Sequence, residues 1–179
     1  MSTYHHGDLR AAVLAAAGKL IEKEGLAGLS VREAARRAGV SHNAPYRHFP
    51  DRDALLAALA TEGFTLLKKS LENRSGRELG EAYVRFALSH PQRFRLMFGG
   101  LLALESYPDL RAEAQATHER LTAAFAGLGA EAKFAAAAAW SLVHGLAHLI
   151  LDGQLENSED FVKRVLGAIR LAVGPQRSA

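Results

Sequence analysis

Apolar positions recur at helical spacing along nearly the whole chain. In the first segment, Leu9, Val13, Ala17, Leu20 and Ile21 would lie on one face of a helix. No run alternates apolar and polar residues as a half-buried strand would, and no Asn-Gly pair marks a hairpin. We therefore predict an all-α fold of about nine helices. The predicted helices cover residues 7–24, 30–39, 41–49, 52–73, 77–89, 91–98, 109–126, 130–151 and 158–173.

Local signals place the ends of several helices. Ser30 and Glu33 have the spacing of a capping box, in which the Ser30 hydroxyl accepts from the Glu33 amide and the Glu33 carboxylate accepts from the Ser30 amide. Ser41 and Asp51 are placed to cap the next two helices. The turn formers of residues 73–76 interrupt the apolar stripe, so we place the main structural boundary there.

The segment from Ser30 to Phe49 predicts a helix-turn-helix. Its two short helices are joined by Ala38-Gly39-Val40-Ser41, where Gly39 can adopt the positive φ that a tight turn needs. Small side chains at Ala35 and Ala38 allow the helices to cross closely. In such a motif the second helix enters the major groove of DNA.

Residues on and around the second helix suit a DNA surface. Asn43 could pair with an adenine edge and Arg32 with a guanine edge, while the Tyr46 hydroxyl can donate to phosphate. Taken singly, Tyr46 could instead be a core aromatic, Arg47 a solvated charge and His48 a helix cap. The predicted DNA-binding residues are Ser30, Arg32, Ser41, His42, Asn43, Ala44, Tyr46, Arg47, His48 and Arg52.

Charge and composition narrow the function further. Residues 1–52 hold eight Lys/Arg and five Asp/Glu, so they carry the whole net charge of +3, which favours an anionic partner for this part. The chain has no cysteine, which excludes disulfides and thiolate metal sites. Its start lacks the features of a signal peptide, so we expect a cytoplasmic protein. Residues 134–151 carry no charged residue, but this alanine-rich run contains two histidines and a glycine. It predicts a helix buried between its own domain and a partner subunit rather than a membrane span.

The residues from Gly28 to Leu56 resemble the DNA-binding domain of the TetR family of transcriptional regulators. The resemblance rests on Gly28-Leu29-Ser30-Val31-Arg32-Glu33-Ala34-Ala35, on the Gly39-Val40-Ser41 turn and on Tyr46-Arg47-His48-Phe49-Pro50. One departure is Pro45, where the family usually has Leu, Ile or Val. Because proline lacks an amide hydrogen, we predict a recognition helix with a distorted or shifted start.

The second half of the chain is similar to one TetR subgroup. Trp140-Ser141-Leu142-Val143-His144-Gly145 resembles the Trp/His/Gly signature of its C-terminal domain. This resemblance implies a homodimer in which helices 130–151 and 158–173 pair with their twins. Phe161, Val165, Ile169 and Val173 repeat on one face of the last helix, as such pairing needs. The predicted domains are 1–52, a three-helix DNA-binding domain, and 53–179, a helical bundle for ligand binding and dimerisation, with helix 52–73 linking them.

The family also implies a small-molecule site. Candidate ligand-binding residues are Phe86, His90, Phe94, Met97, Phe98, Trp140, His144 and His148, although such a cluster could equally be core. His144 and His148 have metal-ligand spacing, but residue 145 is Gly and no third ligand is evident, so we predict no metal and no cofactor. No Gly-x-Ser-x-Gly elbow or phosphate loop is present, so we predict no enzymatic activity.

These observations together predict a ligand-responsive repressor. A homodimer would bind a palindromic double-stranded operator with half-sites one helical turn apart. An unknown small-molecule inducer would shift helix 52–73 and release the DNA. The alternative is a ligand-independent DNA-binding protein whose C-terminal domain only dimerises.

Overall fold

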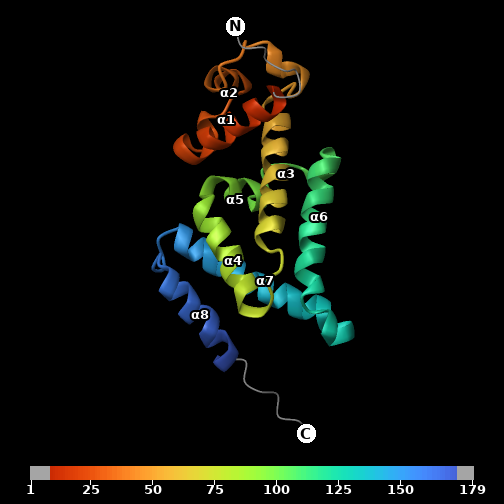
Figure 1. The fold of residues 1–179 in the computed structure, drawn as a ribbon, viewed down its shortest axis with the longest axis vertical. Helices are drawn as coiled ribbons and strands as arrows, with labels where there is room; N and C mark the ends of the chain where they lie inside the picture. The colour runs from red at the N-terminus through yellow and green to blue at the C-terminus, as the bar shows by residue number, and fades with distance from the viewer. Residues whose placement is uncertain (1–8, 173–179) are drawn as a thin grey trace. The chain divides into compact units, whose positions relative to one another are not determined.

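The computed structural model describes residues 9–172, with side chains to residue 168. The prediction of an all-α fold is confirmed, because this part of the chain contains helices and no strands. Val173 and the side chain of Ile169, predicted on the dimerisation face, lie outside the described residues. The α-helices are α1 (Leu9–Glu24), α2 (Val31–Arg37), α3 (Arg52–Ser70), α4 (Gly76–Ser89), α5 (Pro91–Phe98), α6 (Pro108–Ala123), α7 (Ala132–Leu151) and α8 (Glu159–Ala172), with 3₁₀ turns η1 (Leu26–Gly28), η2 (Ala44–Arg47), η3 (Leu104–Ser106) and η4 (Ala126–Glu131) (Figure 1).

The described chain folds into two compact units. The first comprises the residues up to Leu66 together with His90–Ala116, and the second comprises Leu67–Ser89 and the residues from Thr117 onward. The predicted turn after α3 is present, with positive φ at Asn73 and Gly76. The division into units does not follow that turn, because α5 and the start of α6 belong with α1 and α2.

The first unit joins α1 to α5 through a helix N-terminus. The first amides of a helix have no partner within it. Here the Glu22 carboxylate accepts from the amides of Gln92 and Arg93, each at 3.0 Å. A carboxylate at this position is also favoured by the positive end of the helix dipole.

A buried arginine holds the same helices from inside the first unit. Arg93 is 7% exposed, and its Nη1 donates to Glu62 Oε2 at 2.6 Å and to the Leu59 carbonyl at 3.3 Å. A Cβ on Gly18 would overlap the Arg93 guanidinium, and one on Gly63 would lie 3.1 Å from Arg93 Cγ. Two glycines thus give the arginine its space, and Glu62 supplies the counter-charge that a buried guanidinium requires.

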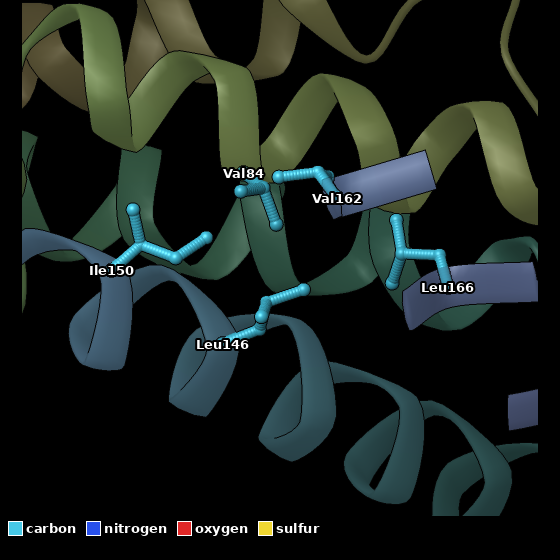
Figure 2. Packing of buried hydrophobic residues seen from close by; sticks show 5 residues of the cluster. All are labelled: Val84, Leu146, Ile150, Val162 and Leu166. Atoms are coloured by element: carbon cyan, nitrogen blue, oxygen red, sulfur yellow. The ribbon is translucent and has the colours of Figure 1, made fainter. Parts of the chain in front are cut away.

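The second unit has its core where α4 packs on α7 and α8. Val84 of α4, Leu146 and Ile150 of α7, and Val162 and Leu166 of α8 form one buried cluster (Figure 2). Phe161 and Val165, which were predicted on the apolar face of the last helix, are partly buried against this cluster. The apolar face of α8 is therefore broader than the predicted row.

The apolar helix α7 has two unlike faces. Ala136, Leu146, Ala147 and Ile150 are buried, whereas Phe134, Leu142 and Leu149 are 60%, 48% and 47% exposed. By length and composition alone, the stretch Ala126–Leu151 could cross a membrane, and 22% of its most apolar window is buried. Its backbone leaves helical geometry at Gly129, with φ 56° and ψ −124°, so the continuous α-helix is the 20 residues of α7.

We expect Ile150→Ala to lower the free energy of unfolding by about 2–5 kcal/mol, because it empties space in the packed cluster of α4, α7 and α8. Denaturant unfolding followed by circular dichroism measures this change. Leu128→Ala is the control, because Leu128 is 55% exposed in η4 and its truncation should change the stability by less than about 0.5 kcal/mol. Equal effects of the two substitutions would contradict the assigned core.

Candidate DNA-binding surface and ligand cavity

The turn after α2 is a Schellman motif centred on Gly39. Gly39 has φ 70°, the Val40 amide donates to the Ala35 carbonyl at 3.1 Å, and the Gly39 amide donates to the Arg36 carbonyl at 3.2 Å. These two bonds satisfy carbonyls that the end of a helix leaves open. The predicted positive φ of Gly39 is therefore confirmed. A side chain at this position would carry the cost of left-handed backbone, about 1–2 kcal/mol.

The start of α2 confirms half of the predicted capping box. The Ser30 hydroxyl accepts from the Glu33 amide at 3.1 Å. The predicted return bond is wrong, because the Glu33 carboxylate accepts from Arg36 Nε at 2.8 Å and from Arg37 Nε at 2.8 Å. Charged donors one turn away outcompete a neutral amide for a carboxylate. Arg37 also donates to Glu24 at 2.6 Å, which ties α2 to α1.

The second helix of the motif is a 3₁₀ turn, so the prediction of a full helix over residues 41–49 is wrong. Pro45 is buried at the second position of η2, and its carbonyl accepts from the amides of His48 and Phe49 at 2.9 Å each. Proline cannot donate the amide bond that an α-helix would use here. The Ser41 carbonyl, rather than its hydroxyl, accepts from the Ala44 amide at 3.1 Å. The predicted distortion caused by Pro45 is thus present in the structure.

The polar residues of this segment face solvent. Tyr46 is 42% exposed, which argues against the alternative of a core aromatic. Within the described part of the chain, the side chains of Arg32, Asn43 and Arg47 make no hydrogen bond or ion pair. Of the ten predicted DNA-binding residues, Ala44 and Arg52 are partly buried, and the exposed ones are Ser30, Arg32, Ser41, His42, Asn43, Tyr46, Arg47 and His48.

Arg52 has a structural task that the sequence did not indicate. Its Nε donates to the Leu29 carbonyl at 3.0 Å and its Nη2 to the Leu26 carbonyl at 2.7 Å, so it caps the end of η1. Its Nη1 has no such bond to any residue that the structure describes. Next to it, Asp51 caps α3 as predicted, since its Oδ1 accepts from the Ala54 amide at 2.7 Å.

The second unit contains an apolar cavity of about 670 Å³. Gly80 allows α4 to pack closely on α7 and α8 at the cavity wall, since a Cβ there would lie 3.2 Å from Val143 and 3.4 Å from Leu166. The volume is in the range of small-molecule sites. Its walls come from α4, α6, α7, α8 and the start of η4, and consist of Gly76, Arg77, Leu79, Gly80, Tyr83, Leu121, Phe125, Ala136, Ala139, Trp140, Leu142, Val143, Leu166 and Gly167.

The eight predicted ligand-binding residues are divided between the two units. His90, Phe94, Met97 and Phe98 belong to the first unit, where the ring centroids of Phe94 and Phe98 are 4.9 Å apart. Phe86, Trp140, His144 and His148 belong to the second unit. Trp140 is the one member of the predicted set that lines the 670 Å³ cavity.

Sequence reasoning missed Tyr83, which organises the polar groups beside the cavity. Trp140 Nε1 donates to Tyr83 Oη at 2.9 Å, and Tyr83 Oη lies 2.9 Å from His144 Nδ1. Burial raises the pKa of Tyr83, whereas burial and then the charge of His148 lower the pKa of His144. Both shifts favour the uncharged forms, so the hydrogen bond between Tyr83 and His144 joins two neutral groups. No group of three or more side chains placed to hold a metal occurs among the described residues.

The fold and the exposed turn define a DNA-binding transcriptional regulator of the helix-turn-helix class. Residues 13–59 match the family described as "Bacterial regulatory proteins, tetR family". Residues 77–169 match the "Tetracyclin repressor-like, C-terminal domain". The chain belongs to the TetR family, whose members are transcriptional regulators and not enzymes.

Solved structures are similar over almost the whole chain. A protein with unknown function from Rhodococcus sp. RHA1 is 36% identical, with a TM-score of 0.80 over 94% of this chain and 95% of its own. The TetR family transcriptional regulator PfmR from Thermus thermophilus is 23% identical, with a TM-score of 0.63 over 88% of this chain and 96% of its own. The multidrug binding protein EbrR, complexed with ethidium, is 22% identical, with a TM-score of 0.64 over 93% of this chain and 100% of its own. Comparison with curated proteins gives no match.

We expect Glu33 to stabilise the fold above about pH 4.5 and to lose this effect as the pH falls toward 2. Its hydrogen bonds from Arg36 and Arg37 lower its pKa from 4.5 to about 2, so protonation breaks favourable contacts of the folded state. Thermal unfolding across this pH range should show a shallower loss of stability for Glu33→Gln than for the wild type.

The control for this measurement is Glu131→Gln, at an exposed glutamate of η4 that makes no ion pair within the described residues. It should follow the wild-type curve. Parallel curves for Glu33→Gln and the wild type would contradict the role of Glu33.

Proposed function

We propose that this TetR family regulator is a ligand-responsive repressor that binds a palindromic operator as a homodimer and is released by a small-molecule inducer. The observation that carries the proposal is the set of exposed donors around η2 in a chain that also encloses an apolar cavity. Residues 1–52 serve as the DNA-binding part, and residues 53–179 serve for ligand binding and dimerisation.

Side chains around η2 read the operator. Asn43 and Arg32 contact base edges, while Tyr46, His48 and the remaining Nη1 of Arg52 contact phosphates. This assignment is supported by the exposure of Asn43, Arg32, Tyr46 and His48. It is also supported by the lack of any partner for Arg32 and Asn43 within the described residues. A single short turn reads few base pairs, so two copies are needed for a specific site.

The exposed face of α7 pairs with the same face of a second subunit. Phe134, Leu142 and Leu149 lie on this face, and exposed large apolar side chains in a row mark an interaction surface. Gly145 lies between them in sequence, and a Cβ there would meet nothing within 4 Å in the single chain. A twofold contact through α7 and α8 would cover these residues in a cytoplasmic protein and makes a membrane unnecessary as their partner.

The inducer occupies the cavity of the second unit, and α3 transmits its effect. The similar EbrR structure is described as a multidrug binding protein complexed with ethidium, which supports a ligand-binding role for this fold. Helix α3 begins at Arg52 beside η1 and continues past Leu66 into the second unit. A shift of α3 changes the distance between the two DNA-reading turns, and a coupling of about 1–3 kcal/mol changes operator occupancy 5–150-fold.

The deciding experiment measures binding to DNA from just upstream of the protein's own gene across a salt titration, with a scrambled fragment of equal length as control. We expect preference for the native fragment and a steep fall of affinity with salt. Adding a bound inducer should weaken the complex. If a ligand saturates the cavity and leaves operator affinity unchanged, the inducer role is refuted and DNA binding is independent of the ligand, as in the alternative of a ligand-independent DNA-binding protein. If no ligand binds the cavity, the alternative of a purely structural C-terminal domain is favoured.

We expect Tyr46→Ala to weaken binding to every DNA sequence by a similar factor, because Tyr46 contacts phosphate. Tyr46→Phe, which removes only the hydroxyl, should have nearly the same effect. Fluorescence anisotropy with the operator and with single-base variants measures both substitutions. A loss confined to one base of the operator would assign Tyr46 to base recognition instead.

We expect Leu149→Arg to convert the dimer to monomers and to abolish tight operator binding, because it buries a charge in the subunit contact. Sedimentation velocity gives the oligomeric state. The matched control is Leu128→Arg, at a leucine of η4 that is 55% exposed and lies outside α7. The assigned dimer face is refuted if both variants stay dimeric.

A further inference from the structure

The lining of the 670 Å³ cavity has one charged side chain. Most of its walls are apolar side chains and glycines, and Arg77 is the single ionisable group among them besides Tyr83, whose raised pKa keeps it neutral. No carboxylate of the described residues lines the cavity, so an organic cation placed there would be buried without a counter-charge, which is costly. The lining therefore favours a neutral or an anionic ligand.

Arg77 lies at the edge of the cavity with part of its guanidinium available. Its Nε is 3.0 Å from Glu81 Oε1, and its Nη1 is 4.0 Å from the position that a Cβ on Gly167 would take. Gly167 lines the cavity and Glu81 does not. Arg77 thus makes an ion pair with Glu81 through Nε, while Nη1 and Nη2 make no hydrogen bond within the described residues. With 61% of its side chain exposed, Arg77 can meet a ligand at the mouth.

Deeper in the cavity, the polar groups already satisfy one another. Trp140 Nε1 donates to Tyr83 Oη, and Tyr83 Oη and His144 Nδ1 are hydrogen-bonded at 2.9 Å. The Trp140 N–H and the Tyr83 hydroxyl are therefore both engaged with neighbouring side chains. A ligand that fits therefore needs an apolar body, and a hydrogen-bond acceptor at its inner end would gain no hydrogen bond from this wall.

We propose that the ligand is an anionic amphiphile, an apolar chain or ring system with one terminal carboxylate, whose charged end binds Arg77 at the cavity mouth. Guanidinium and carboxylate form paired, charge-assisted hydrogen bonds. The N-terminus of α4, which begins at Gly76 beside Arg77, adds a favourable dipole for the same charge. This proposal rests on the inducer site proposed above and names its chemical class.

The experiment uses three probes with the same ten-carbon chain: decanoate, 1-decanol and decylammonium. The protein has one tryptophan, Trp140, which lines the cavity, so tryptophan fluorescence reports occupancy of this site. We expect decanoate to bind most tightly and decylammonium most weakly. Arg77→Gln should weaken decanoate binding by about tenfold, as loss of a hydrogen bond to a charged group does, and should leave decanol binding unchanged.

Two control variants complete the test. Arg85→Gln changes another arginine of α4, which pairs with Glu159 and does not line the cavity, and should leave all three affinities unchanged. Ala139→Phe fills the cavity and should abolish binding of decanoate and decanol, with circular dichroism confirming the fold.

Equal affinities for the three probes would overturn the selection of an anion. Absence of binding by all three, checked by calorimetry, would overturn the cavity as the site of such a ligand. Operator binding measured on the same preparation separates these failures from failure of the DNA-binding proposal. Decanoate binding that depends on Arg77 but leaves operator affinity unchanged would support the site and refute the inducer role alone.

Discussion

Short helices leave many backbone groups without partners, and the first unit is built around satisfying them. A helix of seven residues such as α2 leaves most of its amides or carbonyls unpaired at one end or the other. Ser30 accepts from the start of α2, the Schellman turn at Gly39 closes its end, and Arg52 takes the carbonyls of η1. Glu22 does the same for α5 from another helix. These caps act together with buried apolar residues of the same segment, among them Leu29, Val31, Ala34, Ala35 and Phe49, to hold the turn around η2 in place.

In the second unit, the sizes of the side chains determine where space is left between the helices. Glycines and alanines on α4, α7 and α8 leave the space of the cavity, while the larger apolar residues on the same helices form the core cluster. The second unit also has one polar cap. Arg120 Nη2 donates to the Leu71 carbonyl at 2.9 Å and to the Arg74 carbonyl at 3.1 Å, so it satisfies backbone carbonyls in the segment that follows α3. The positions of small and large residues along these helices therefore determine both the cavity and the core.

Helix periodicity made the larger elements predictable, and local chemistry made some caps predictable. The α-helices of the described residues, the hydroxyl of Ser30, the cap by Asp51 and the turn at Gly39 follow from residues close in sequence. The 3₁₀ form of η2 was not predicted. The missing amide of Pro45 predicted a disturbance but did not specify its form.

The cavity of the second unit was harder to predict because its walls carry little signal in sequence. A glycine or alanine that borders a cavity looks like one that allows close packing. Tyr83, in an apolar helix face, cannot be told from a core aromatic until Trp140 and His144 are brought to its hydroxyl. Arg93 and Glu62 are 31 residues apart, and only the fold brings their charges together.

The order in which the chain visits its two units has a practical consequence for hybrid regulators. The chain passes between the units after Leu66, after Ser89 and after Ala116. A hybrid that joins the first 66 residues to the body of another family member would leave Glu22 and Glu62 without the amides and the guanidinium that they hold. An exchange of the N-terminal segment in this scaffold therefore requires α5 to be transplanted together with it.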